Sequence, residues 1–178
     1  KAASHLLPLL MAELDADRLA SPAGQLLARW TYRMDRELAA PLIYHTWINA
    51  LWPKLIADDL GDHAESYRRP KPMTMIGILR DRPQWCDDRA TPDVDSCAGL
   101  IRTSFDDTVA SLTEEFGDKL RKWRWGTVHQ THFKALPFGY LPVIGPLFTV
   151  SEETDGGPHS ILRADHRQIA EGQGLEMG

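Results

Sequence analysis

The sequence predicts a mainly α-helical chain that ends in an irregular, partly β-stranded segment. Over residues 4–116, apolar side chains recur at spacings of three and four, which gathers them on one face of a helix. From Pro137 onward, prolines and glycines interrupt the chain repeatedly, and neither suits the interior of a helix or strand. We therefore expect a helical region over residues 1–117 and a connecting region over residues 118–178 that is not a complete domain.

Two helices are expected near the N-terminus. Residues 4–14 place five apolar side chains on one helical face. Ser21 followed by Pro22 marks the start of the second helix, because a serine side chain caps free N–H groups and proline fits the first helical position. The apolar repeat after Pro22 continues as far as Leu38, so we expect this helix to extend that far.

Two longer helices follow. The first places seven apolar side chains inward over residues 43–56 and should end near Gly61, because glycine adopts the backbone conformation that closes helices. The second covers residues 100–116 and should stop at Gly117 for the same reason. The connecting region offers only a candidate strand at residues 160–169, where apolar side chains flank polar ones.

Composition and charge indicate which classes of binding partner are disfavoured. The chain has 178 residues, of which 43% are apolar and 25% charged, a composition typical of globular proteins. Its net charge of −5 does not favour binding to nucleic acid or to an anionic membrane surface. No apolar run approaches the roughly 20 residues that a membrane-spanning helix needs. We expect neither nucleic acid nor a membrane among the partners.

The two cysteines, Cys86 and Cys97, flank a polar stretch that contains Pro92. A zinc site would need two more sulfur or imidazole ligands at short spacing, and the neighbouring residues are carboxylates. A disulfide that closes a surface loop is the favoured interpretation, and the alternative is two unrelated buried thiols. A disulfide would indicate an oxidising compartment, so we expect a periplasmic or secreted protein.

The residues give no complete catalytic or metal-binding arrangement. His129 and His132 could share a helical face, but zinc would need a third ligand, so a structural hydrogen bond is the better interpretation for His129. Ser104 has no glycine-flanked nucleophile motif around it. Adjacent carboxylates such as Asp106 and Asp107 are usually solvated or stabilise a helix terminus. We expect no metal ion and no catalytic residue here.

One segment carries a specific resemblance. Residues 123–129 have the sequence Trp-Arg-Trp-Gly-Thr-Val-His, which follows a predicted helix end at Gly117 and precedes a double glycine at residues 156–157. This order resembles the β subunit of the penicillin acylase (penicillin amidase) family, whose members include acyl-homoserine lactone acylases and cephalosporin acylases. Upstream, Leu-Leu-Ala-Arg-Trp at residues 26–30 is similar to a helical motif of the same family. Where the family has Thr-Val-Asn, residues 160–162 are Ser-Ile-Leu.

The resemblance implies an N-terminal-nucleophile hydrolase with a four-layer αββα sandwich, matured by self-cleavage. Such an enzyme cleaves the amide between an acyl group and an amine, as in a penicillin, a cephalosporin or an N-acyl-homoserine lactone. Its nucleophile is a serine at the start of the β subunit, whose own α-amino group acts as the base. The family's serine, oxyanion-hole asparagine and calcium ligands match no position of this chain.

The resemblance therefore implies an internal piece of the β subunit, expected to be inactive alone and to need no cofactor. Its helical region would be a spacer, and residues 118–178 would return into the αββα sandwich. Its partners would be the remainder of the β subunit, the α subunit and a small acyl amide, whose binding residues remain unknown. The alternative is a non-catalytic helical binding or scaffold module of the periplasm.

The tryptophan motif has an expected structural role. Trp123 and Trp125 cannot share a helical face, because residues i and i+2 point about 200° apart, but they would share one face of a strand. Gly126 would then mark a bend or a close approach of the backbone. We expect Trp123 and Trp125 to anchor the helices to the sandwich, with His129 in a structural hydrogen bond.

Overall fold

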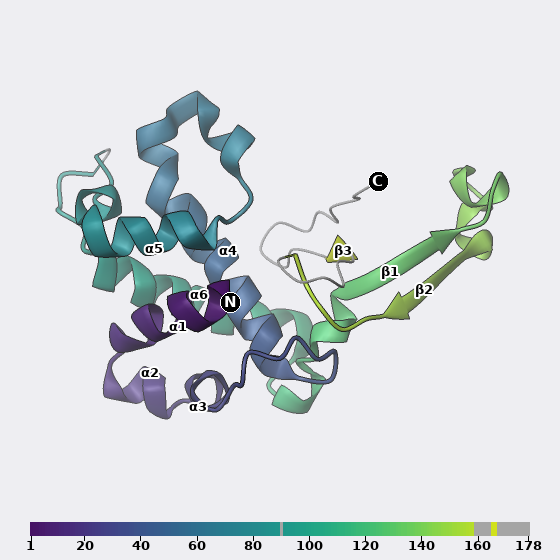
Figure 1. Ribbon diagram of the computed structural model, residues 1–178, viewed down its shortest axis with the longest axis horizontal. Coiled ribbons are helices and arrows are strands. Elements are labelled where there is room, and N and C mark those ends of the chain that lie inside the picture. The colour runs from purple at the N-terminus through teal and green to yellow at the C-terminus, as the bar shows by residue number, and fades with distance from the viewer. Residues whose placement is uncertain (90, 159–164, 167–178) are drawn as a thin grey trace.

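Helix α4 (Ala39–Leu60) is the central element of a computed structural model that describes residues 1–89, 91–158 and 165–166. From Ala40 to Ile48 every side chain of this helix is buried, so the first half of α4 is enclosed around its whole circumference. A helix that is buried on all sides belongs in the middle of a domain. The other helices surround it and form a helical body, from which a pair of strands projects (Figure 1).

Five other α-helices surround α4 among the described residues: α1 (Ala2–Ala12), α2 (Ala16–Ala20), α3 (Pro22–Ala28), α5 (Pro72–Asp81) and the longer α6 (Cys97–Phe116). Helix α6 packs along α4, and α1 packs against α5 (Figure 1). Mainly helical architecture is therefore confirmed. The 3-10 helices are η1 (Gly61–Tyr67), η2 (Pro83–Cys86), η3 (Leu120–Lys122), η4 (Trp125–Thr127), η5 (Phe138–Tyr140) and η6 (Gly145–Phe148).

Local capping residues set three helix ends where the sequence predicts them. The Ser21 hydroxyl accepts a hydrogen bond from the amide of Gly24 at 3.1 Å, which caps α3. Helices α4 and α6 end at Gly61 and Gly117, whose φ angles are +50° and +76°. Such positive φ angles strain residues with a side chain, so glycine at these places stops each helix.

The helix that begins at Pro22 is shorter than predicted. It ends at Ala28 instead of Leu38, and the following residues form a loop in which Tyr32 has φ +63°. Trp30 is still buried, and its indole N–H donates to the carbonyl of Arg33 at 2.9 Å. Carbonyl groups farther along this loop accept hydrogen bonds from distant segments of the chain. These tertiary bonds compete with helical ones, and the loop conformation prevails.

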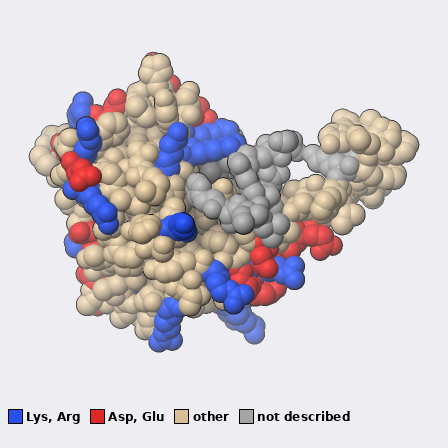
Figure 2. Space-filling view, viewed as in Figure 1, with Lys and Arg blue, Asp and Glu red and all other residues tan. Residues whose placement is uncertain are grey.

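The sheet is antiparallel, with strand order β2-β1-β3. Its strands are β1 (His129–Lys134), β2 (Thr149–Glu153) and the two-residue β3 (Asp165–His166). Strands β1 and β2, with the η5 and η6 turns between them, extend away from the helical body and are called the arm below (Figure 1). The surface at the end of the arm carries no charged side chain in Figure 2. Apart from β3, the predicted strand at residues 160–169 lies outside the described residues.

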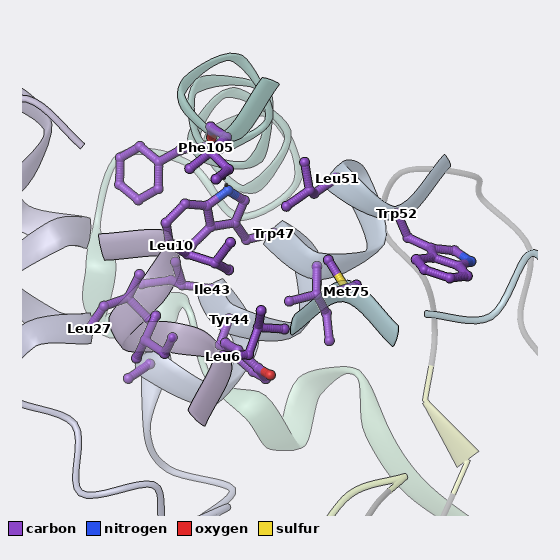
Figure 3. Close-up of a cluster of buried hydrophobic side chains, with 14 of the residues drawn as sticks. Leu6, Leu10, Leu27, Ile43, Tyr44, Trp47, Leu51, Trp52, Met75 and Phe105 are labelled. Carbon is purple, nitrogen blue, oxygen red and sulfur yellow. Dashed lines mark hydrogen bonds between the residues drawn. The ribbon is translucent and has the colours of Figure 1, made fainter. Parts of the chain in front are cut away.

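The core is organised around Trp47 of α4, which is completely buried. Its indole N–H lies 3.2 Å from the carbonyl oxygen of Ile101 and 3.0 Å from the hydroxyl oxygen of Ser104. The ring meets Phe105 edge to face at a centroid distance of 4.9 Å. In Figure 3, Trp47 occupies the middle of the apolar cluster, next to the helix that carries Phe105. This arrangement buries a large aromatic side chain while satisfying its polar group.

A disulfide joins Cys86, at the end of η2, to Cys97, the first residue of α6. The two Cα atoms are 5.0 Å apart. The enclosed loop is also ordered by hydrogen bonds, since the amide of Asp95 donates to the carboxylate of Asp87 at 2.9 Å. Of the helices in the described part of the chain, none combines the length and apolar character needed to cross a lipid bilayer.

Removing the disulfide should destabilise the chain. The two cysteines are 11 positions apart, and for a loop of this length the chain-entropy model gives a contribution of about 2–3 kcal/mol to the free energy of unfolding. We expect Cys86→Ser/Cys97→Ser to lower the free energy of unfolding by that amount, measured by urea denaturation with circular dichroism. Mass spectrometry of the unreduced wild-type chain should show no free thiol. Two free thiols after expression in an oxidising compartment would contradict the bridge.

Candidate functional site

The motif residues 123–129 lie where the arm meets the helical body. Three segments converge there: residues 34–38 of the loop before α4, residues 124–129, and residues 153–157 after β2. We call this meeting point the junction. Main-chain hydrogen bonds connect its segments. Those to the loop before α4 run from Trp125 N to Leu38 O, from Gly126 N to Arg36 O and from Gly156 N to Met34 O, with N···O distances of 3.0, 2.9 and 2.7 Å.

Trp125 is the central side chain of the junction and is only 1% exposed. Its ring is stacked between two imidazoles, with centroid distances of 4.8 Å to His45 and 4.9 Å to His129. The indole N–H donates to the carbonyl of Gly156 at 2.7 Å. One side chain thus contacts α4, the first residue of β1 and the turn after β2, which fixes these elements relative to one another.

His129 forms hydrogen bonds with Thr154, in the chain beyond β2. Its Nδ1 lies 3.0 Å from the carbonyl oxygen of Thr154, and the amide of Thr154 donates to the His129 carbonyl at 3.1 Å. The Thr154 hydroxyl oxygen lies 3.2 Å from the same nitrogen, so Nδ1 faces both polar groups of Thr154. His129 is completely buried. This contact joins the start of β1 to the chain after β2, at the base of the arm.

His129 and His132 do not share a face, contrary to the helical arrangement considered from the sequence. Both lie in β1, where residues three apart point to opposite sides of the strand. His132 instead pairs across the sheet, with its Nδ1 2.7 Å from the hydroxyl oxygen of Ser151. Among the described residues, no group of three His, Cys, Asp or Glu side chains is arranged to hold a metal ion.

The backbone around the two motif tryptophans is not a strand. Trp123 directly follows η3, and Trp125 begins η4. The amides that a strand would offer to a neighbouring strand bond instead to the loop before α4. Both tryptophans are nevertheless buried, and Trp123 donates its indole N–H to the carbonyl of Gly117 at 2.9 Å. Trp123 thereby connects the end of α6 to the junction.

Two glycines allow the junction segments to approach closely. A Cβ atom on Gly126 would lie 2.8 Å from a carboxylate oxygen of Glu153 and 2.9 Å from Cβ of Arg36. A Cβ atom on Gly157 would lie 2.9 Å from the terminal methyl of Met34. The predicted close backbone approach at Gly126 is thus accounted for. At Gly126 a larger residue would displace the arm or the loop.

Charged residues surround the junction. The guanidinium of Arg124 makes two hydrogen bonds to Glu37, with N···O distances of 2.8 and 2.9 Å, and also pairs with Glu153. Hydrogen bonding to Glu37 raises the pKa of Arg124 above its ordinary value. Arg36 donates to the carbonyl of Glu153 at 2.9 Å. The sequence offered no signal for these pairs, because their members are separated by at least 29 positions.

The other sequence candidates serve as structural groups. The Ser104 hydroxyl is completely buried and donates to the carbonyl of Ile101 at 3.0 Å. Asp106 pairs with Arg18, and Asp107 lies 3.2 Å from the ammonium nitrogen of Lys54. The carboxylates therefore connect helices instead of forming an acid–base pair.

A hollow of about 380 Å³ lies between α4, η1 and α6. Trp52 and Ile56 contribute its apolar lining. The charged side chains at its edge are engaged in ion pairs, since Arg68 lies 2.8 Å from Glu65. The hollow thus presents no arrangement of a nucleophile and a base among the described residues.

Comparison with protein families identifies one match. The sequence profile of the family described as penicillin amidase matches residues 1–175. A comparison with individual curated proteins found no match. Because the family profile covers nearly the whole chain, this protein belongs to the penicillin amidase family.

Replacing the central indole should strongly destabilise the chain. We expect Trp125→Ala to lower the free energy of unfolding by about 3 kcal/mol or more, the range for removing a buried aromatic ring. The control is Met73→Ala, since this side chain is 66% exposed and its loss should change stability by no more than about 0.5 kcal/mol. Urea denaturation measures both. A loss below about 1 kcal/mol for Trp125→Ala would contradict its central role.

His129 should bind no metal. We expect elemental analysis of the chain, after incubation with zinc and gel filtration, to give no stoichiometric zinc. His129→Ala should leave that result unchanged, because the ring is completely buried and no third ligand lies near it among the described residues. Stoichiometric zinc that disappears in His129→Ala but persists in His132→Ala would overturn the structural assignment.

Proposed function

We propose that this chain is a part of a hydrolase that cleaves the amide bond between an acyl group and an amine. Membership of the penicillin amidase family, matched over residues 1–175, is the observation that carries the proposal. The substrates proposed are amides of the penicillin, cephalosporin or N-acyl-homoserine lactone type.

Within that enzyme, we assign this chain a supporting role. The motif residues Trp125, Gly126 and His129 are used for stacking, close backbone approach and hydrogen bonding to main-chain atoms. Such contacts fix the relative position of elements and leave no group directed at a substrate. The nucleophilic serine, its α-amino base and the oxyanion hole would come from the rest of the enzyme.

The proposed organisation has two regions. Residues 1–117 form the helical spacer, and residues 118–178 lead from it towards the αββα sandwich. The proposed partners are the remainder of the β subunit and the α subunit, together with the acyl amide. Calcium, where the enzyme holds it, would be bound outside this chain. The disulfide between Cys86 and Cys97 supports a periplasmic or secreted location, because such bonds persist in oxidising compartments.

The 178-residue chain alone should hydrolyse no amide. We expect no turnover of chromogenic phenylacetyl or long-chain acyl amides by the purified chain, and turnover by the protein expressed from the complete coding region. The matched control is the complete protein with its N-terminal nucleophilic serine replaced by alanine, which should be inactive. Activity of the purified chain would refute the supporting role. Inactivity of a correctly matured complete protein on every amide tested would instead favour a non-catalytic scaffold.

A further inference from the structure

The hollow between α4, η1 and α6 follows one face of α4 and is called the groove below. Its lining residues on this face recur at intervals of three or four for three turns of the helix. They are Thr46, Asn49, Ala50, Pro53, Ile56 and Ala57. At 1.5 Å per residue, positions 46–57 span roughly 16 Å. With a volume of about 380 Å³, the groove therefore has room for a small extended molecule.

One part of the lining is apolar. Trp52 and Ile56 line the groove and are both almost completely buried. The indole N–H of Trp52 donates to the carbonyl of Tyr67, so the ring offers the groove no free donor. In Figure 3, Trp52 lies apart from the cluster around Trp47. An apolar chain in the groove would therefore bury its surface against Trp52 and Ile56.

Two hydroxyl groups of the lining have no hydrogen-bond partner among the described residues. They belong to Thr46 on α4, which is only 6% exposed, and to Ser111 on α6. A helical threonine can donate to the carbonyl four residues earlier, as Thr108 does to Ser104 at 2.7 Å, but Thr46 makes no such bond. Water can bond to these hydroxyls in the open groove. A ligand that displaces this water must supply a polar atom in its place.

The charged side chains of the lining are already paired. Arg68 lies 2.8 Å from Glu65, and Asp107 lies 3.2 Å from the ammonium nitrogen of Lys54. Among the described residues, the groove therefore offers no unpaired charge to a ligand. A charged ligand would lose hydration without gaining a counter-ion, which is unfavourable. The lining thus favours a neutral molecule that has one polar group and an apolar chain.

We propose that the groove binds a linear neutral amide, with the amide group at Thr46 and the apolar chain along Trp52 and Ile56. An amide has a carbonyl that accepts and an N–H that donates, so it matches both capacities of a hydroxyl group. Thr46 lies at one end of the lined face, which leaves the following two turns of α4 for the chain. The choice of an acyl amide rests on the proposed function, since this is the proposed substrate class.

Titrations followed by NMR test the class of ligand. The 178-residue chain, labelled with ¹⁵N, is titrated with hexanamide, hexanoate and hexylammonium, which have the same number of carbon atoms and differ in charge. Hexanamide should shift amide signals of groove residues on α4 and α6. Each charged relative should bind at least about tenfold more weakly, because its charge finds no counter-ion. No binding of hexanamide, equal or tighter binding of a charged relative, or shifts confined to other parts of the chain would overturn the proposal.

Substitutions test which residues form the site. Thr46→Val removes the hydroxyl at nearly the same size and should weaken hexanamide binding about fivefold. Ala57→Phe, at an exposed position of the lining, should fill the groove and abolish binding. The matched controls are Thr103→Val and Ala110→Phe, at exposed positions of α6 outside the lining, and they should leave binding unchanged. Unchanged affinity in Thr46→Val or Ala57→Phe, with helix content preserved by circular dichroism, would contradict the proposed site.

The complete protein tests whether the groove is open in the enzyme. Its nucleophilic serine is replaced by alanine to prevent turnover, and bound hexanamide is detected by saturation-transfer NMR. Part of the signal should disappear in Ala57→Phe and persist in Ala110→Phe. A signal that Ala57→Phe leaves unchanged would mean that another segment fills the groove, and would overturn the proposal. Amide hydrolysis by the complete protein with its serine intact is measured separately, so binding in the groove and the proposed activity can fail independently.

Discussion

The stacking of Trp125 between His45 and His129 determines how the arm is attached to the helices. The three rings come from different parts of the chain: α4, η4 and the start of β1. Stacking adds to the burial of apolar area, and the indole N–H is satisfied by Gly156. Trp125 therefore limits how far β1 and β2 can rotate relative to α4, because the ring stacking and the indole hydrogen bond restrict different directions of movement.

The residues next to this stack bring separate segments of the chain close together. The glycine at position 126 brings the backbone next to Glu153 and Arg36, and the ion pairs of Arg124 surround that contact. These ion pairs are partly exposed, so their contribution to stability is small compared with the buried ring. Their consequence is geometric: they hold the loop before α4 against the chain that follows β2.

The body and the arm differ in how they are stabilised. The body has a continuous core around α4, with Trp47 at its centre and a disulfide closing its outer loop. The arm has hydrogen bonds between its strands but no apolar layer over Phe133 and Val150 among the described residues. The motif residues of this chain make structural contacts, and its arm exposes an apolar face. The chain is therefore suited to packing against other polypeptide.

The sequence alone was sufficient for features set by local chemistry. The serine cap at Ser21 and the helix ends at Gly61 and Gly117 follow from neighbouring residues, and the structure places them as predicted. The motif at residues 123–129 was also sufficient to indicate the penicillin amidase family, which the profile match establishes.

Only the tertiary structure decided the loop after Ala28 and the two 3-10 turns around Trp125. Their main-chain groups bond to one another across more than 80 positions, as Trp125 N does to Leu38 O, so no local pattern contains that information. The same reason applies to the histidines. Their spacing suits a helix face, but the pairing of β1 with β2 places them on opposite sides of a strand, where His129 enters the stack and His132 contacts Ser151.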